Sequence, residues 1–234
     1  MINFKGTAPY DFAALRALVS ALRAPGGCPW DAAQTHLSIR RNFLEEAYEA
    51  CEAFDLDNPD MMCEELGDVL LQVLFHTDIE RAAGRFTLED VCDRECRKLI
   101  FRHPQLFGGE EADWEELKKR EKGQRTLHDS MQGVAKSLPA LWRAEKLAKK
   151  ARQAHAGDDE QALLAQLRAA ADAVCAQKDP QALGRLLFTA AALAGEWRQD
   201  PEQLTHEACE RFMTRFTVPE PACTEQVQAK QNGE

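Results

Sequence analysis

The sequence predicts an all-α protein built from two tandem helical units of the four-helix-bundle type. Apolar residues recur with a period near 3.6 residues along almost every segment. No stretch alternates apolar and polar residues as a half-buried strand does. The chain has 234 residues, of which 44% are hydrophobic and 29% charged, so it is long enough to bury a sizeable core. We therefore expect helices throughout, separated by loops.

Short breaks divide the N-terminal half. Segment 24–31, APGGCPWD, is expected to be a loop because Pro and Gly favour turns, and HPQLFGGEEAD, from His103, is expected to be another. Thr87 and Asp90 resemble a capping box, which marks a helix start. The helices predicted for this half cover residues 11–23, 38–56, 60–83, 87–102 and 113–122.

A polar connector, residues 124–138, separates the predicted first domain, residues 1–123, from the second, residues 139–216. In the second domain Asp200 is the expected N-cap of a helix with Pro201 at its first position. We expect residues 217–234 to be a disordered tail, since they hold few large apolar residues. The helices predicted for the second domain cover residues 139–154, 159–177, 181–198 and 201–216.

The chain contains an internal repeat. EELGDVLLQVLF, residues 64–75, aligns with QALGRLLFTAAA, residues 181–192, and LEEAYEAC, residues 44–51, aligns with RAAADAVC, residues 168–175. The second copy keeps the helical pattern and loses the acids. The guanidinium of Arg185 would repel a cation, and alanine side chains have no atom that can bind one. We expect it to bind no metal and to serve a structural role. The residues that replace the acids are Ala169, Ala170, Ala173, Ala182 and Arg185.

The acids of the first copy share one side of each of two helices. Glu46 and Glu49 are three residues apart and Glu45 and Glu49 four, and Glu65 and Asp68 repeat this spacing on the next helix in an apolar setting. We expect that helix to be packed deeply. Buried carboxylates then require basic partners, raised pKa values or a bound cation. Oxygen ligands converging from two helices favour Mg²⁺ or Mn²⁺.

Ion pairs, iron and zinc account less well for these residues. Ion pairs within the two helices are excluded by the absence of Lys or Arg between Arg41 and Arg81. A di-iron bundle needs a Glu-x-x-His pair on each of two helices, which the sequence lacks. Cys92 and Cys96 lie one turn apart, but no His or Cys is spaced to complete a zinc site. A solvated acidic stripe stays an alternative for Glu45, Glu49 and Glu52.

Charge and composition exclude some partners. The net charge of -10 argues against a nucleic-acid or anionic-membrane surface, because a phosphate backbone is held mainly by clustered Lys and Arg. The sequence has neither an apolar run of about 18 residues nor a secretory signal, so we expect a cytoplasmic protein. The scattered cysteines fit reduced thiols.

Together the motifs resemble the MazG family of nucleoside triphosphate pyrophosphohydrolases, from about residue 11 to residue 216. Glu-Glu-x-x-Glu alone is a weak signal, but the order and spacing of the whole set are specific. The resemblance implies an all-α metal site, hydrolysis of nucleoside triphosphates to monophosphate and pyrophosphate, dependence on Mg²⁺, and a homodimer. The matching motifs are GGCPWD (26–31), Glu-Glu-x-x-Glu (45–49), Glu-x-x-Asp (65–68) before VLLQV, RHPQLFG (102–108), WEELKKREK (114–122) and SLPALWRAEKLAKKA (137–151).

By position, the resemblance implies that Glu46, Glu49, Glu65 and Asp68 are metal ligands. Glu45 belongs to the motif, and our hypothesis gives it a supporting role as general base for a water or as the group that orients a ligand. Because the second copy is degenerate, catalysis is expected in the first alone. Two alternatives are a nucleotide-binding or regulatory helical module of weak activity, and a structural bundle whose acids serve solubility.

Substrate contacts are expected from cationic and aromatic side chains. Trp30 is a candidate for stacking on a base, with a packing anchor as the alternative. We expect His103 to cap a helix. Lys146, Lys149 and Lys150 share a helix face or nearly so. The candidate phosphate donors, with a solvated basic face as the alternative for the short helix, are Arg102, Lys118, Lys119 and Lys122.

Overall fold

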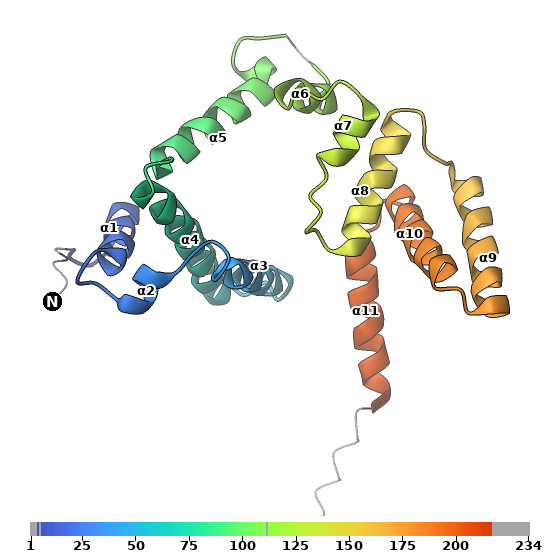
Figure 1. The fold of residues 1–234 in the computed structure, drawn as a ribbon, viewed down its shortest axis with the longest axis horizontal. Coiled ribbons are helices and arrows are strands. Elements are labelled where there is room, and N and C mark those ends of the chain that lie inside the picture. Colours follow the sequence, from blue (N-terminus) through green and yellow to red (C-terminus); the bar gives the residue numbers. More distant parts are fainter. Residues whose placement is uncertain (1–3, 5, 111, 217–234) are drawn as a thin grey trace, which may run out of the picture. The chain divides into compact units, whose positions relative to one another are not determined.

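The structure is a computed structural model that describes residues 4, 6–110 and 112–216. Within these residues all regular elements are helices and none is a strand, which confirms the all-α prediction (Figure 1). The chain divides into two compact units, Met1–Trp114 and Glu115–Glu234. None of the described helices is long and apolar enough to cross a membrane. The expected disordered tail, residues 217–234, lies outside the described residues.

The first unit is built on a hairpin of two long helices. α3 (Arg40–Asp55) and α4 (Pro59–Ala82) pack side by side, and α1 (Phe12–Arg23) and α5 (Leu88–Arg102) also contact α4 (Figure 1). The core gathers where α1 and α5 meet the C-terminal half of α4. Its buried residues are Val19, Ile39, Leu74, Phe75 and Leu88.

Local signals fix where these helices begin. The Asn58 side chain accepts hydrogen bonds from the backbone N–H groups of Asp60 and Met61, and Pro59 occupies the first helical position of α4. At α5 the Thr87 hydroxyl accepts from the Asp90 N–H, and the Asp90 carboxylate accepts from the Thr87 N–H at 2.8 Å. The predicted capping box is confirmed.

Two short helices were not predicted, and the loop expected over residues 24–31 was wrong from Pro29 onward. α2 (Pro29–Ala33) lies in and just beyond the expected loop 24–31, and α7 (Leu127–Gln132) lies in the expected connector. Each is too short to show apolar periodicity. Thr126 and Asp129 form a second capping box that stabilises α7. Between α5 and α7 lie η1 (Pro104–Leu106) and α6 (Trp114–Glu121).

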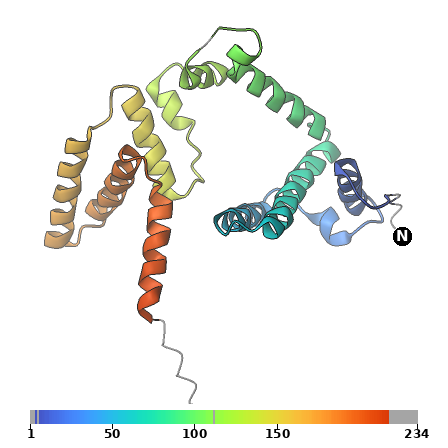
Figure 2. The same cartoon turned by 180° about the vertical axis from the view of Figure 1, so that it is seen from behind.

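The second unit contains α8 (Ala140–Gln153), α9 (Glu160–Gln177), α10 (Pro180–Glu196) and α11 (Pro201–Met213), followed by η2 (Thr214–Phe216). α9 and α10 form a hairpin, and α10 also packs on α8 (Figures 1 and 2). The hairpin occupies the sequence positions of the second repeat, as α3 and α4 occupy those of the first. Asp200 caps α11 as predicted, accepting from the N–H groups of Glu202 and Gln203.

Candidate metal centre

The α3–α4 hairpin gathers acidic side chains near its closed end. One carboxylate oxygen each from Glu46, Glu49 and Glu65 lies within 4.8 Å of the others. Asp68 follows Glu65 by one turn, and its negative charge acts on both Glu46 and Glu65. The structure thus brings three of the four predicted ligands together, while Asp68 is outside the group of carboxylate oxygens that lie within 4.8 Å of one another.

The cluster carries uncompensated negative charge. Burial raises the pKa of Glu46, and the charges of Asp68 and Glu49 raise it further. Burial likewise raises the pKa of Glu65, with the Glu49 and Glu64 charges adding to it. Among the residues described, no basic side chain pairs with Glu46, Glu49 or Glu65. An oxygen-only cluster of this kind fits a hard divalent cation, which would relieve the repulsion.

Glu45 differs from its neighbours. Its Oε1 accepts from Arg41 Nε at 2.7 Å, an i,i+4 ion pair on the exposed side of α3. The expectation that no ion pair forms within the helix pair was therefore wrong for Glu45, because Arg41 lies one turn before it. A general-base or orienting role for Glu45 requires that this exposed pair be exchangeable, which is usual for surface ion pairs.

The acidic end of the hairpin is less deeply packed than expected. α1 and α5 meet α4 only beyond the acids, and the side of α4 around Leu66 is half exposed. A Cβ added at Gly67 would meet no atom within 4 Å. Tyr48 and Leu44 on α3 are also more than half exposed. A two-helix hairpin covers one face of each helix, so large apolar side chains of both helices stay exposed within one chain.

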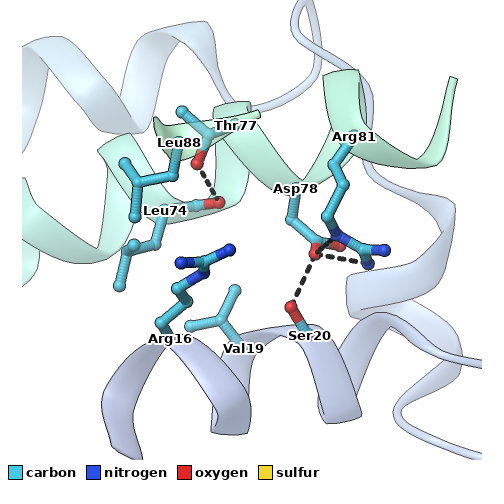
Figure 3. A pocket seen from close by; sticks show the side chains of 8 residues that line it. All are labelled: Arg16, Val19, Ser20, Leu74, Thr77, Asp78, Arg81 and Leu88. Atoms are coloured by element: carbon cyan, nitrogen blue, oxygen red, sulfur yellow. Dashed lines mark hydrogen bonds and ion pairs between the residues drawn. The ribbon is translucent and has the colours of Figure 1, made fainter. Parts of the chain in front are cut away.

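Two further acids on α4 are buried, and neither was predicted from the sequence. Asp78 accepts hydrogen bonds from Ser20 at 2.7 Å and from Arg81 at 2.7 Å (Figure 3). It also accepts from Arg23 at 3.1 Å. Burial alone would raise the pKa of Asp78, but the hydrogen bonds from Ser20 and Arg81 hold it below its usual range. A sequence signal was available in part, since Arg81 follows Asp78 by three residues.

Glu80 is the second buried acid of α4. Arg85 donates two hydrogen bonds to its carboxylate, at 2.5 and 2.6 Å, and His36 contacts it from the other side. The hydrogen bonds from Arg85 have the largest effect and the contact with His36 the next, and together they lower the pKa of Glu80 to about 2. Asp78 and Glu80 thus have basic partners, whereas Glu46, Glu49 and Glu65 have none among the described residues. This difference indicates a structural role for Asp78 and Glu80. Asp78 also lines a small pocket, together with Arg16, Val19, Ser20, Leu74, Thr77, Arg81 and Leu88 (Figure 3).

Trp30 and Arg102 lie in different settings. Trp30, on α2, is 61% exposed, which disfavours the packing-anchor alternative within the described chain. Arg102 ends α5 with its guanidinium over the Trp114 ring, 5.5 Å from the centroid. His103 is the C-cap of α5, as expected, and its Nδ1 lies 2.8 Å from the Leu99 carbonyl oxygen.

The candidate phosphate donors Lys118 and Lys119 lie on α6, with Lys122 just beyond its end, in the second unit. Lys118 Nζ lies 2.8 Å from Glu115 Oε1. Lys150, on α8, donates to Ser130 at 3.0 Å. Burial lowers the pKa of Lys150, and the charges of Lys122, Lys118 and Lys119 lower it further against the opposing effect of Glu115. These lysines therefore share one positive region of an acidic chain.

The positions of the second repeat that correspond to the acids hold no comparable cluster in the part that the structure describes. Ala170 and Ala182 are buried. Arg185 is exposed and lies 3.5 Å from Asp179. This arrangement fits the predicted structural role of the repeat.

Comparisons with known proteins agree with the geometry. Residues 34–107, which include all four candidate ligands, match the MazG nucleotide pyrophosphohydrolase domain. The chain is 38% identical to the nucleoside triphosphate pyrophosphohydrolase/pyrophosphatase MazG of Thermotoga maritima, over 88% of this chain and 84% of the relative. It is 33% identical to the nucleoside triphosphate pyrophosphohydrolase of Escherichia coli K12, over 86% of this chain and 84% of the relative. The enzyme of the same name from Mycolicibacterium smegmatis is 44% identical over 59% of this chain and 45% of its own length.

The fold, the acidic hairpin and these relatives define a helical hydrolase of nucleotides. The chain belongs to the MazG family.

Proposed function

We propose that the protein hydrolyses nucleoside triphosphates to nucleoside monophosphate and pyrophosphate, in a Mg²⁺-dependent reaction carried by the first repeat. The observation that carries this proposal is the group of three carboxylates, Glu46, Glu49 and Glu65, within 4.8 Å of one another and without basic partners among the described residues. The names of the relatives, which describe pyrophosphohydrolases of nucleoside triphosphates, support the same reaction. Mn²⁺ is a suitable substitute, since it accepts the same oxygen ligands.

Glu46, Glu49, Glu65 and Asp68 would hold the cation. A divalent cation bound there would neutralise phosphate charge and lower the pKa of an attacking water. The pKa of Glu46 is raised by burial and by the neighbouring carboxylates, and a bound cation would favour its ionised form. Glu45, once free of Arg41, would accept a proton from water or orient a ligand.

Groups outside the cluster would bind the rest of the substrate. The exposed ring of Trp30 offers a face for stacking on a base. Arg102 and the lysines Lys118, Lys119 and Lys122 supply positive charge for the phosphates. We place the reaction in the cytoplasm, where free triphosphates occur, and the free thiols of the described cysteines are compatible with a reducing compartment.

The test is an assay of pyrophosphate release from a panel of triphosphates with and without Mg²⁺. Glu49→Ala and Asp68→Ala should each reduce metal-dependent release by at least a hundredfold while the helical circular dichroism is unchanged. Asp172→Asn, a change of an acid on α9, is the control and should retain full activity. Retained turnover in both site variants would refute the assignment. Triphosphate binding without any release by the wild type would favour the regulatory module instead.

A further inference from the structure

Two histidines meet edge to edge, through their Nδ1 atoms, at the edge of the first core. His36 precedes α3 and His76 lies on α4, and their Nδ1 atoms are 2.7 Å apart. The ring planes are nearly parallel, inclined by 8°, and the centroids are 5.0 Å apart, so the two Nδ1 atoms point toward each other in the ring planes. The Phe43 ring of α3 lies 5.7 Å from the His76 ring. The pair therefore joins the segment before α3 to α4.

The hydrogen bonds allow a limited number of protons. His36 Nε2 contacts the carboxylate of Glu80, which can only accept, so His36 Nε2 carries a proton. The short Nδ1–Nδ1 contact holds one further proton, on either ring. Adding a second would set two N–H groups against each other at 2.7 Å. The contact is compatible with at most one positive charge on the pair.

The surroundings do not stabilise a second charge. On α4 the facing acid is Glu80, which already accepts two hydrogen bonds from Arg85. From α3 the facing ring is the uncharged Phe43. On α1 the cations are engaged elsewhere, Arg16 with Glu89 and Arg23 with Asp78. Burial lowers the pKa of His76, and the charge of His36 lowers it further, which agrees with this proton count.

The segment that the pair holds carries an exposed aromatic side chain. Residues 24–39 connect α1 to α3 and include α2 with Trp30. Arg23, the last residue of α1, donates through Nη1 to the Asp31 carbonyl oxygen in this segment at 2.5 Å. At the other end, His36 is followed by Ile39, which is buried in the core. The histidine pair thus attaches the segment to α4, as Arg23 attaches it to α1.

We propose that His36 and His76 form a proton-linked clamp that positions segment 24–39, and with it Trp30, against α4. The clamp is closed while the pair holds at most one positive charge, and it opens when both imidazoles are protonated. Both are positioning residues. Their effect on substrate rests on the proposed function, but the clamp itself does not.

The first test measures amide hydrogen exchange of the full chain without added metal between pH 8 and pH 5, corrected for intrinsic rates. Exchange in segment 24–39 should rise at least tenfold as pH falls, in step with the titration of His76 followed by NMR, while exchange in α9–α10 stays unchanged. His76→Phe keeps a ring against Phe43 and removes the second ionisable group. In this variant the rise of exchange in segment 24–39 at low pH should therefore disappear. His128→Phe, at an exposed position on α7, is the matched control and should keep it.

A second variant protects the test against misfolding. His36→Gln retains a donor for Glu80 and cannot take up a proton, so it should also lose the rise at low pH. The proposal would be overturned if exchange in segment 24–39 still rose at low pH in either folded variant. It would also be overturned if exchange in the wild type did not change with pH. In turnover assays the wild-type KM should rise as pH falls, and His76→Phe should flatten that rise while keeping kcat within about twofold. Absence of turnover would refute the proposed function alone, because exchange is measured without substrate.

Discussion

Glu46 and Glu65 link the stability of the first unit to pH through their raised pKa values. A carboxyl whose pKa is higher in the folded state than in the unfolded chain destabilises the fold as pH rises through that pKa. A bound cation should reverse the effect where the carboxyls are ionised. The folded protein without metal should therefore be most stable, with respect to this cluster, in mild acid.

Replacing Glu46 with Gln tests this linkage. At pH 8 without metal, Glu46→Gln should raise the free energy of unfolding by a few tenths of a kcal/mol, as expected for like charges one helical turn apart. Wild type should gain thermal stability from Mg²⁺, more at pH 8 than at pH 5, and the variant should lose most of that gain. Thermal unfolding followed by circular dichroism measures both, with Asp172→Asn as control. An equal Mg²⁺ effect in the variant would contradict the ligand assignment.

The buried Asp78 has a different effect, because its partners lower its pKa. Its stabilising contribution is present above the pKa of an unfolded Asp and is lost as pH falls through the lower folded value. Asp78→Ala leaves the Arg23 guanidinium, whose side chain is 8% exposed, without its carboxylate. We expect a loss of about 3 kcal/mol in the free energy of unfolding at pH 7, measured with urea.

Asp93→Ala provides the contrast for Asp78→Ala. Asp93 pairs with Arg97 on the exposed face of α5 at 2.7 Å, and such pairs contribute about 0.5 kcal/mol or less. A comparable loss in the two variants would show that burial of the Asp78 network is not what stabilises the first unit.

At the scale of the element, Asp200 joins two helices of the second unit. Its carboxylate caps α11 and also accepts from Trp142 Nε1 of α8 at 2.7 and 2.9 Å. Asp200→Ala should lower the free energy of unfolding by about 2 kcal/mol, from a lost cap and a lost hydrogen bond. Asp179→Ala removes the cap of α10 and a weaker contact to Arg185, and should cost about 1 kcal/mol. Urea unfolding of both variants tests the order, and the reverse order would contradict it.

Helix existence could be predicted from the sequence wherever the apolar period extended over three turns or more. Thr87 and Asp200 located helix starts because capping depends only on residues within the next turn. The short helices α2 and α7 could not be found in this way, since five or six residues do not establish a period. The start of α3 at Arg40, two residues later than predicted, reflects the turn formed by Thr35 and Ser38.

The residues of the site show the same division between local and distant information. The helical spacing of Glu46, Glu49 and Glu65 allowed their clustering to be predicted from one hairpin. Ser20, which binds Asp78, and His36, which binds Glu80, lie more than forty residues away in the sequence, so no local pattern revealed them. The ion pair between Arg41 and Glu45 was not predicted, although the two residues lie one helical turn apart and the pair could have been found from the sequence.

At the scale of the whole molecule, half-exposed apolar side chains on α3 and α4 support the homodimer that the family resemblance implies. Leu44 and Tyr48 lie one turn apart on α3, and Leu66, which follows Glu65 on α4, is 50% exposed. A soluble protein gains about 2 kcal/mol for each large apolar side chain that it removes fully from water. A second hairpin packed against this one would form a four-helix bundle and bury apolar side chains that one chain leaves exposed, which agrees with the predicted bundle type.

Leu66→Asn tests that interface without adding charge near the acids. In a symmetric dimer the substitution occurs twice, so the dimer dissociation constant should rise by at least a hundredfold, as measured by sedimentation equilibrium. Activity per chain should fall in parallel with the dimer fraction and recover at high protein concentration. Leu106→Asn changes a leucine that is 71% exposed in η1 and should leave both unchanged. A wild type that sediments as a monomer at micromolar concentration while retaining full turnover would show that one hairpin is sufficient for catalysis.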